Sequence, residues 1–214
     1  MKKQAMALEA VKRLEQQYPD AICSLEYERR NAFQLLVATR LSAQCTDARV
    51  NLVTPALFER FPDAPSLAAA TAADVEPYIR SCGLYKTKAR DLVAMAQMLM
   101  NKHGGEVPST IEELTALPGV GRKTANLVCG DIFHTPGVVV ADTHCIRISN
   151  RLGLCDSKDP RKVEVQLRAL LPADKSNAFC HRLVLFGREI CTSRSPRCDA
   201  CPLRDLCQHH ATEA

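Results

Sequence analysis

The sequence predicts an all-α protein, and three features of the chain support this prediction. Apolar residues recur at helical spacing in almost every segment of the 214 residues. Prolines, glycines and capping residues separate these segments, as they do at helix ends. The only strand-like run is Val138-Val-Val140, which is too short for a sheet and is interpreted as an extended connector. We therefore expect roughly ten or more helices packed on one another.

The predicted helices follow one another with short breaks. Pro19 ends the first, and Gly104-Gly105 closes the long helix that follows the turn at 83–88. Ser109, with Glu112 three residues later, predicts a capping box for the next helix. The predicted helices are Lys3–Tyr18, Asn31–Leu41, Asp47–Phe61, 66–70, 74–82, 88–100, 111–117, 125–133, one from Asp142, one from Asp159-Pro160 and one over Asp174–Ile190.

The stretch Leu117-Pro-Gly-Val-Gly-Arg-Lys-Thr-Ala125 joins two of these helices by a tight turn. Gly119 and Gly121 can adopt positive φ and carry no Cβ, so the backbone can lie close to a ligand. A helix begins after Gly121, and its first N–H groups form a ready phosphate site. The stretch predicts a helix-hairpin-helix that grips a nucleic-acid backbone, with Arg122 among its contacts.

Lys123 lies in the first turn of that second helix. The helix dipole disfavours a cation at this end and so favours the neutral, nucleophilic amine. Lysine also binds phosphate as a point charge, so the turn alone leaves the two roles open.

Asp142 follows the hairpin's second helix after a connector that can bring the chain back, so Asp142 can face Lys123. A carboxylate there can exchange protons during amine chemistry and stabilise positive charge on a sugar. An aspartate before a helix is also a good N-cap, and both roles can coexist. His144 is a weaker candidate ligand close by. Arg147 and Arg151, one helical turn apart, are candidate contacts for phosphate or acidic side chains.

Composition limits the class of protein. The net charge of +4 is compatible with a polyanion partner. No apolar run is long enough to span a bilayer, and the N-terminus does not read as a signal peptide. Eleven cysteines, an odd number, indicate a reducing cytoplasm rather than a disulfide framework.

Four of these cysteines crowd into the spacing Cys191-x6-Cys198-x2-Cys201-x5-Cys207. Four thiols at such spacing indicate one metal centre. The spacing alone leaves zinc and iron–sulfur open, because zinc sites usually pair two short hooks and four thiolates also suit a [4Fe–4S] cube. The enclosed loop carries Arg194 and Arg197 and no carboxylate, which predicts a phosphate grip.

Taken together, the hairpin, Val140-Ala-Asp-Thr-His144 and the cysteine spacing resemble the endonuclease III family. Leu41-Ser-Ala-Gln-Cys-Thr-Asp47 and Gly83-Leu-Tyr-Lys-Thr-Lys88 match two further family segments. The resemblance covers nearly the whole chain and implies a [4Fe–4S] cluster. It also implies two helical domains flanking a DNA-binding cleft: a six-helix domain at 25–136, and a cluster domain built from 1–24 and 137–214.

The resemblance further implies a base-excision-repair DNA glycosylase with AP lyase activity on oxidised pyrimidines turned out of the duplex. Lys123 matches the family's Schiff-base nucleophile, and the strand is then nicked 3′ to the abasic site. Asp142 matches the assisting carboxylate. Gln44 matches the residue that fills the gap left by the extruded nucleotide, and Leu84 matches an intercalating wedge. Cys45 departs from commoner members.

The remaining alternatives are a thymine·guanine mismatch or adenine-type glycosylase of the same fold, a non-catalytic DNA-binding module and a zinc-binding regulator. The adenine branch lacks a lysine at the position of Lys123 and carries an extra C-terminal domain. We expect a monomer that binds double-stranded DNA with damaged or abasic nucleotides, does not bind membranes, and works in the cytoplasm, associated with the nucleoid through DNA.

Overall fold

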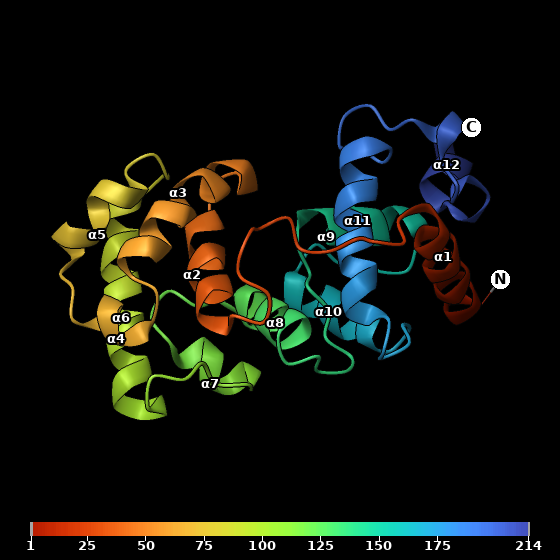
Figure 1. Cartoon of the computed structure of the whole chain (residues 1–214). Helices are drawn as coiled ribbons and strands as arrows, with labels where there is room; N and C mark the ends of the chain where they lie inside the picture. Colours follow the sequence, from red (N-terminus) through yellow and green to blue (C-terminus); the bar gives the residue numbers. More distant parts are fainter. Residues whose placement is uncertain (1, 214) are drawn as a thin grey trace. The chain divides into compact units, whose positions relative to one another are not determined.

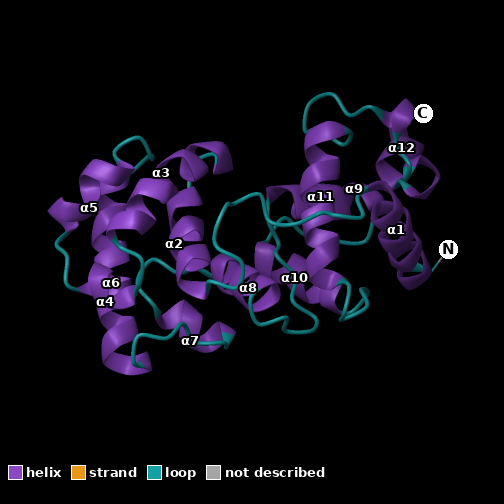
Figure 2. Cartoon of the chain, viewed as in Figure 1, coloured by secondary structure: helices purple, strands orange, loops and turns teal. Residues whose placement is uncertain are grey.

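The computed structural model describes residues 2–213, and over this range the chain is helical with no strand (Figure 2). Twelve α-helices and two short 3-10 helices are present in the described part. The prediction of an all-α fold is therefore confirmed. The chain divides into two compact units (Figure 1). We call Cys23–Phe133 the hairpin unit, and the residues up to Ile22 together with those from His134 onward the cluster unit.

The hairpin unit is built around its longest helix, α6. Helices α2, α4 and α5 pack on α6, α3 packs on α2 and α5, and α8 packs on α2 and α7. Leu92, Met95 and Leu99 of α6 are fully buried in this core. The helices of the unit are α2 (Ala32–Ser42), α3 (Asp47–Arg60), α4 (Ala64–Ala68), α5 (Ala72–Ile79), α6 (Tyr85–His103), α7 (Ile111–Ala116) and α8 (Arg122–Asp131).

The ends of these helices follow the predicted chemistry with one shift. Gly104 closes α6 in the left-handed conformation, with φ of 61°. The predicted capping box at Ser109 and Glu112 is wrong by one residue. Thr110 caps α7 instead, by accepting from the Glu113 backbone N–H at 3.2 Å, while its hydroxyl donates to the Glu113 carboxylate at 2.6 Å. The two pairs share the same spacing, so the sequence pattern did not distinguish them.

The cluster unit joins the N-terminal helix to the C-terminal half of the chain. Helix α11 packs against α1 and α9, and α12 packs against α9. Val138, Val139 and Val140 form a buried extended connector into α9, as predicted. The elements of the unit are α1 (Lys3–Gln17), α9 (Thr143–Leu152), α10 (Pro160–Arg168), α11 (Ser176–Glu189), η1 (Cys198–Ala200), η2 (Arg204–Leu206) and α12 (Gln208–Glu213).

The predicted domain boundaries remain a prediction. They place one domain at 25–136 and the other at 1–24 together with 137–214. Among the described residues, no helix combines the length and apolar character that crossing a membrane requires.

Candidate active site and iron–sulfur centre

The turn between α7 and α8 is shaped by Gly119. Its φ of +73° lies in the left-handed region, where a side chain is strained. A Cβ at this position would lie 2.5 Å from Arg40 Nε and 3.0 Å from Asp91 Cβ. Arg40 and Asp91 form a half-buried ion pair beneath the turn, with Nε donating to Oδ2 at 3.1 Å. Glycine is therefore required here by both conformation and space.

Gly121 has a different role from Gly119. Its φ is −93°, so the expectation of positive φ holds for Gly119 but not for Gly121. Gly121 is the N-cap of α8, and a Cβ there would meet nothing within 4 Å. The space beside the N-cap of α8 is therefore open, as an anion site at a helix start needs. Arg122 and Lys123 follow in the first turn, and Lys123 is exposed.

The two segments predicted to probe DNA lie side by side in the hairpin unit. Gln44 and Leu84 are both exposed and both left-handed, with φ of 53° and 58°. A Cβ at Gly83 would lie 3.3 Å from the Gln44 carbonyl oxygen, so the two turns are in contact. Lys88 is fully buried and donates from Nζ to the Leu41 carbonyl at 2.7 Å. Strained exposed residues held by surrounding structure are typical of binding sites.

Asp142 is the N-cap of α9, in the cluster unit. Its Oδ1 accepts from the Cys145 backbone N–H at 2.7 Å. The capping role is therefore confirmed, and within the described part of the chain this bond occupies one carboxylate oxygen. Asp142 is half-buried. Lys123 belongs to the hairpin unit and Asp142 to the cluster unit.

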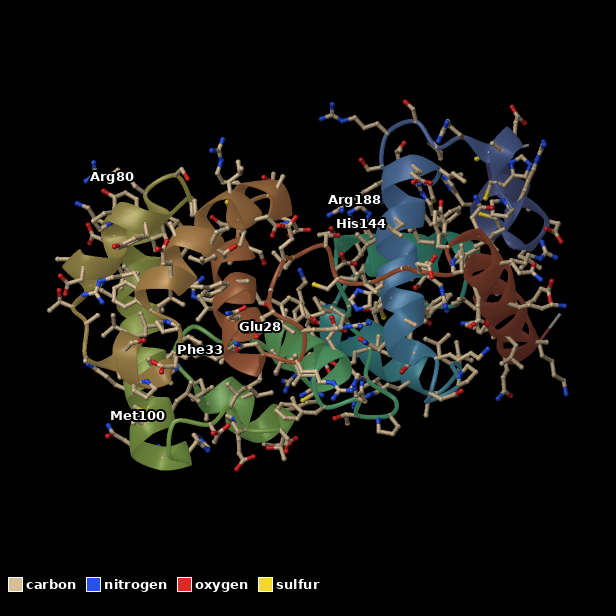
Figure 3. All side chains as sticks on the ribbon, in the orientation of Figure 1. Glu28, Phe33, Arg80, Met100, His144 and Arg188 are labelled. Carbon is tan, nitrogen blue, oxygen red and sulfur yellow. The ribbon has the colours of Figure 1, made fainter. Side chains whose placement is uncertain are left out.

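His144, also on α9, lies against α11 (Figure 3). A Cβ at Gly187 of α11 would lie 2.4 Å from His144 Nδ1, and Arg147 Nη2 lies 3.2 Å from the same nitrogen. The ring is thus held in place by elements of its own unit.

Arg147 and Arg151 both hold the start of the cysteine-rich loop. Their suggested contacts with phosphate or acidic groups stay a prediction. Arg147 donates to the carbonyl of Cys191 at 2.9 Å. Arg151 donates to the Thr192 carbonyl at 2.7 Å and to the Cys191 sulfur at 3.2 Å. Their spacing of one helical turn was the only sequence signal for this shared task.

The four cysteines of the loop line one hollow with about 310 Å³ of empty volume. Cys191 is buried and Cys198, Cys201 and Cys207 are half-buried. Burial, and to a smaller extent the other three sulfurs, raises the pKa of the Cys201 thiol to about 11. All four thiols are free and close enough to interact.

The thiols around this hollow suit an iron–sulfur cluster. Within residues 2–213, no three His, Cys, Asp or Glu side chains converge as ligands of one metal ion. A tetrahedral zinc ion needs its four sulfurs at about 2.3 Å from one point. A [4Fe–4S] cube is wider and takes one thiolate on each iron, so cysteines spread around a hollow suit it. The donor set and its arrangement therefore agree with the predicted cluster.

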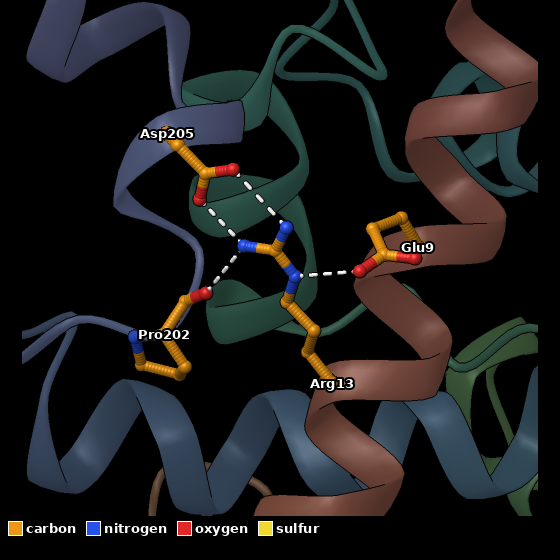
Figure 4. A network of polar contacts seen from close by, with 4 residues as sticks. All are labelled: Glu9, Arg13, Pro202 and Asp205. Atoms are coloured by element: carbon orange, nitrogen blue, oxygen red, sulfur yellow. Dashed lines mark hydrogen bonds and ion pairs between the residues drawn. The ribbon is translucent and has the colours of Figure 1, made fainter.

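The N-terminal helix secures the far side of this loop (Figure 4). Arg13 of α1 donates to the Pro202 carbonyl at 2.9 Å and makes a two-point contact with the Asp205 carboxylate. Glu9, one turn earlier, orients the guanidinium by accepting from Nε at 2.8 Å. A bidentate arginine–carboxylate pair fixes geometry as well as charge. No sequence pattern predicts this contact, because Pro202 and Asp205 lie 189 and 192 residues from Arg13 along the chain.

The two arginines of the loop differ. Arg197 folds back on the end of α11 and donates from Nε to the Glu189 carbonyl at 2.9 Å. It therefore caps a helix C-terminus, where a cation is favoured. Arg194 is exposed, and no hydrogen bond or ion pair engages it in the described structure. Of the two, only Arg194 is left available to bind a ligand with its whole guanidinium.

Comparison with known proteins agrees with the geometry. Residues 37–173 match the HhH-GPD superfamily base excision DNA repair protein, and residues 191–207 match the iron–sulfur binding domain of endonuclease III. The chain is 44% identical to endonuclease III of Synechocystis sp. over 96% of its own length and 93% of that protein. It is also 44% identical to endonuclease III of Bacillus subtilis, over 89% of its own length and 86% of that protein.

A solved structure of a trapped endonuclease III–DNA covalent intermediate superposes with a TM-score of 0.91 at 41% identity, over 100% of this chain and 99% of that one. The match to an iron–sulfur binding domain spans the four loop cysteines, and the chain accordingly carries a [4Fe–4S] cluster. The chain belongs to the HhH-GPD superfamily of base excision DNA repair proteins and, within it, to the endonuclease III family of DNA glycosylases with AP lyase activity.

Proposed function

We propose that this chain removes oxidised pyrimidines from double-stranded DNA with Lys123 as the nucleophile. The observation that carries the proposal is the position of Lys123. Its exposed amine stands in the first turn of α8, two residues after Gly121, whose backbone faces open space. A phosphate bound at this helix start would hold the DNA strand beside the amine. The extruded nucleotide then presents its sugar to Lys123.

The chemistry runs in two stages. The neutral Lys123 amine attacks C1′ of the sugar, the bond to the base breaks, and the base leaves with a proton. The ring opens to a Schiff base between C1′ and the lysine nitrogen. Loss of a proton from C2′ then expels the 3′ oxygen and nicks the strand. A similar endonuclease III has been trapped as a covalent intermediate with DNA, which supports an enzyme nucleophile.

Asp142 is proposed to assist at the sugar. Its capping bond to Cys145 fixes the carboxylate through Oδ1 and leaves Oδ2 to act. A fixed carboxylate stabilises positive charge that develops on the sugar and can accept protons from the attacking amine. The capping bond therefore orients the catalytic group rather than competing with the chemistry.

Contacts to intact DNA are proposed for Gly119, Gly121, Arg122 and Arg194, which meet phosphates. Gln44 is proposed to fill the gap in the stack, and Leu84, 63% exposed, to enter between bases. Cys191, Cys198, Cys201 and Cys207 would hold the cluster, which supplies a four-point iron–thiolate cross-link to the loop that carries Arg194. His144 remains proposed as a minor DNA contact.

Borohydride trapping tests the nucleophile. Duplexes with thymine glycol or an abasic site should form a borohydride-stable adduct with the wild-type protein, and Lys123→Ala should form none. Lys123→Arg is a matched control, because it retains the charge but not the nucleophilic amine. An undiminished adduct in Lys123→Ala would falsify the assignment.

Asp142→Asn tests the carboxylate separately from the cap. Asparagine caps helices as well as aspartate, so the melting temperature should hold. Base release should slow by roughly a hundredfold or more, as for a lost acid–base group. Single-turnover assays measure this rate, and a rate within a few-fold of wild type contradicts the role.

The protein is further proposed to act as a cytoplasmic monomer, associated with the nucleoid through DNA. Gel filtration of the cluster-loaded protein with and without DNA tests the oligomeric state.

A further inference from the structure

Two cysteines outside the iron–sulfur loop lie against each other at the DNA-probing turns. Cys45 directly follows Gln44, and Cys82 stands two residues before Leu84. The Cys45 sulfur lies close enough to the Cys82 thiol to raise its pKa, and neither cysteine is in a disulfide. They are far apart in sequence, so their contact is a product of the fold and joins the two turns directly.

The backbone around the pair is fixed, which makes the contact persistent. The Cys45 N–H donates to the Ser42 carbonyl at 3.0 Å, and the Cys82 N–H donates to the Ile79 carbonyl at 2.9 Å. The close approach of Gly83 to the Gln44 carbonyl described above holds the turns together one residue further along. The two cysteines therefore lie on adjacent, anchored turns.

The two thiols differ in access. Cys45 is half-buried, whereas Cys82 is 1% exposed. Burial and the Cys45 sulfur raise the pKa of Cys82 to about 11, while the nearby cations Lys88 and Arg49 lower it. A small oxidant thus meets Cys45 first, and Cys82 stands behind it as the resolving thiol.

We propose that Cys45 and Cys82 form an oxidative modification site at which a hydroperoxide, such as hydrogen peroxide, drives a reversible disulfide. The Cys45 sulfur attacks one peroxide oxygen and the O–O bond breaks, giving a sulfenic acid and water. The Cys82 sulfur then attacks the sulfenic sulfur and releases the second water. Two thiols are oxidised and one peroxide is reduced, with no other reactant.

The disulfide alters the DNA-probing surface. An S–S bond is about 2.05 Å long, far shorter than a thiol–thiol contact, so both turns must shift to form it. Gln44 and Leu84 are already in left-handed conformations that depend on their surroundings. The effect on DNA rests on the roles proposed for these two residues above. Oxidised protein should therefore bind lesion DNA more weakly, while thiol reductants restore binding.

The experiment uses the full chain with its cluster, treated with graded hydrogen peroxide while the cluster's visible absorbance is followed. Peptide mapping detects the Cys45–Cys82 cross-link, and fluorescence anisotropy measures binding to a duplex with a stable abasic analogue. Cys45→Ala removes the accessible thiol. Cys23→Ala is the matched control, because Cys23 is the other half-buried cysteine outside the cluster.

Wild type and Cys23→Ala should form the cross-link, bind the duplex about tenfold more weakly, and recover with dithiothreitol, whereas Cys45→Ala should keep its affinity. Absence of the cross-linked peptide, or equal loss of binding in Cys45→Ala, overturns the proposal. A cross-link without weaker binding overturns its effect on DNA. Reduced wild type that fails to bind the duplex counts instead against the proposed function, because the cross-link is scored independently.

Discussion

Alanine should lower the stability of the protein at Gly119 but not at Gly121, because the two glycines have different roles in the hairpin. At Gly119, alanine meets two penalties. A left-handed conformation costs a residue with a Cβ about 1–2 kcal/mol. The added Cβ, 2.5 Å from Arg40 Nε, also displaces the half-buried ion pair between Arg40 and Asp91, at a cost of about 1–2 kcal/mol. Gly119→Ala should therefore lower stability by about 2–4 kcal/mol.

At Gly121 the same substitution meets neither penalty. Its φ of −93° suits alanine, and the Cβ would point into open space. Reduced freedom of the unfolded chain stabilises by about 0.4–1 kcal/mol, and the poorer N-cap opposes this by a similar amount. The stability of Gly121→Ala should therefore stay within about 0.5 kcal/mol of wild type. Its methyl group would stand where a phosphate approaches, so lesion-independent DNA binding should weaken by about tenfold.

Thermal unfolding followed by circular dichroism measures the first effect, and anisotropy with an undamaged duplex measures the second. For a chain of this size, Gly119→Ala should lower the melting temperature by about 4–16 °C, and Gly121→Ala by no more than about 2 °C. Equal destabilisation of the two variants would refute the reasoning, since it would mean that neither φ nor the Arg40 contact distinguishes the positions.

Two further predictions concern the cysteine-rich loop. The Arg13 guanidinium holds the pKa of Asp205 below its ordinary value of 3.8, so their contact is complete above that pH and is lost as pH falls through the lowered pKa. In Arg13→Ala the cluster should be lost at a higher pH on acidification, which visible absorbance follows; an unchanged acid profile contradicts the anchoring role. Arg194→Ala should reduce the salt dependence of DNA binding by about one counterion without changing the melting temperature. Arg197→Ala should lower the melting temperature, because Arg197 caps α11, and a reversed pattern would show that the loop is held differently.

Local chemistry made most of the fold predictable. Proline, glycine and N-cap residues act within a few positions, so the boundaries near Gly104, Asp142 and Asp159 could be predicted directly. The hairpin was predictable for the same reason, since its turn and both flanking helices are continuous in sequence. The one misplaced cap, at Ser109 instead of Thr110, arose where two neighbouring pairs offer the same spacing.

Contacts between distant segments were beyond the sequence. No local sequence pattern predicts that Arg13 contacts Pro202 or that Cys45 lies near Cys82, because each pair is brought together only by packing. The candidate DNA-probing residues show the same limit. Gln44 and Leu84 were singled out only by family resemblance, because left-handed φ at a non-glycine residue has no reliable sequence signal.

These unpredicted contacts have a common physical character. Arg147 and Arg151 act mainly on backbone carbonyls of the cysteine-rich loop, and Lys88 acts on the Leu41 carbonyl. Each cation satisfies carbonyl groups that irregular backbone leaves without a helical partner, which a buried segment requires. The basic side chains of this protein therefore have two roles. The side chains of Arg194 and Lys123 are exposed and are the ones proposed to act on DNA, whereas the cations turned inward hold non-helical turns.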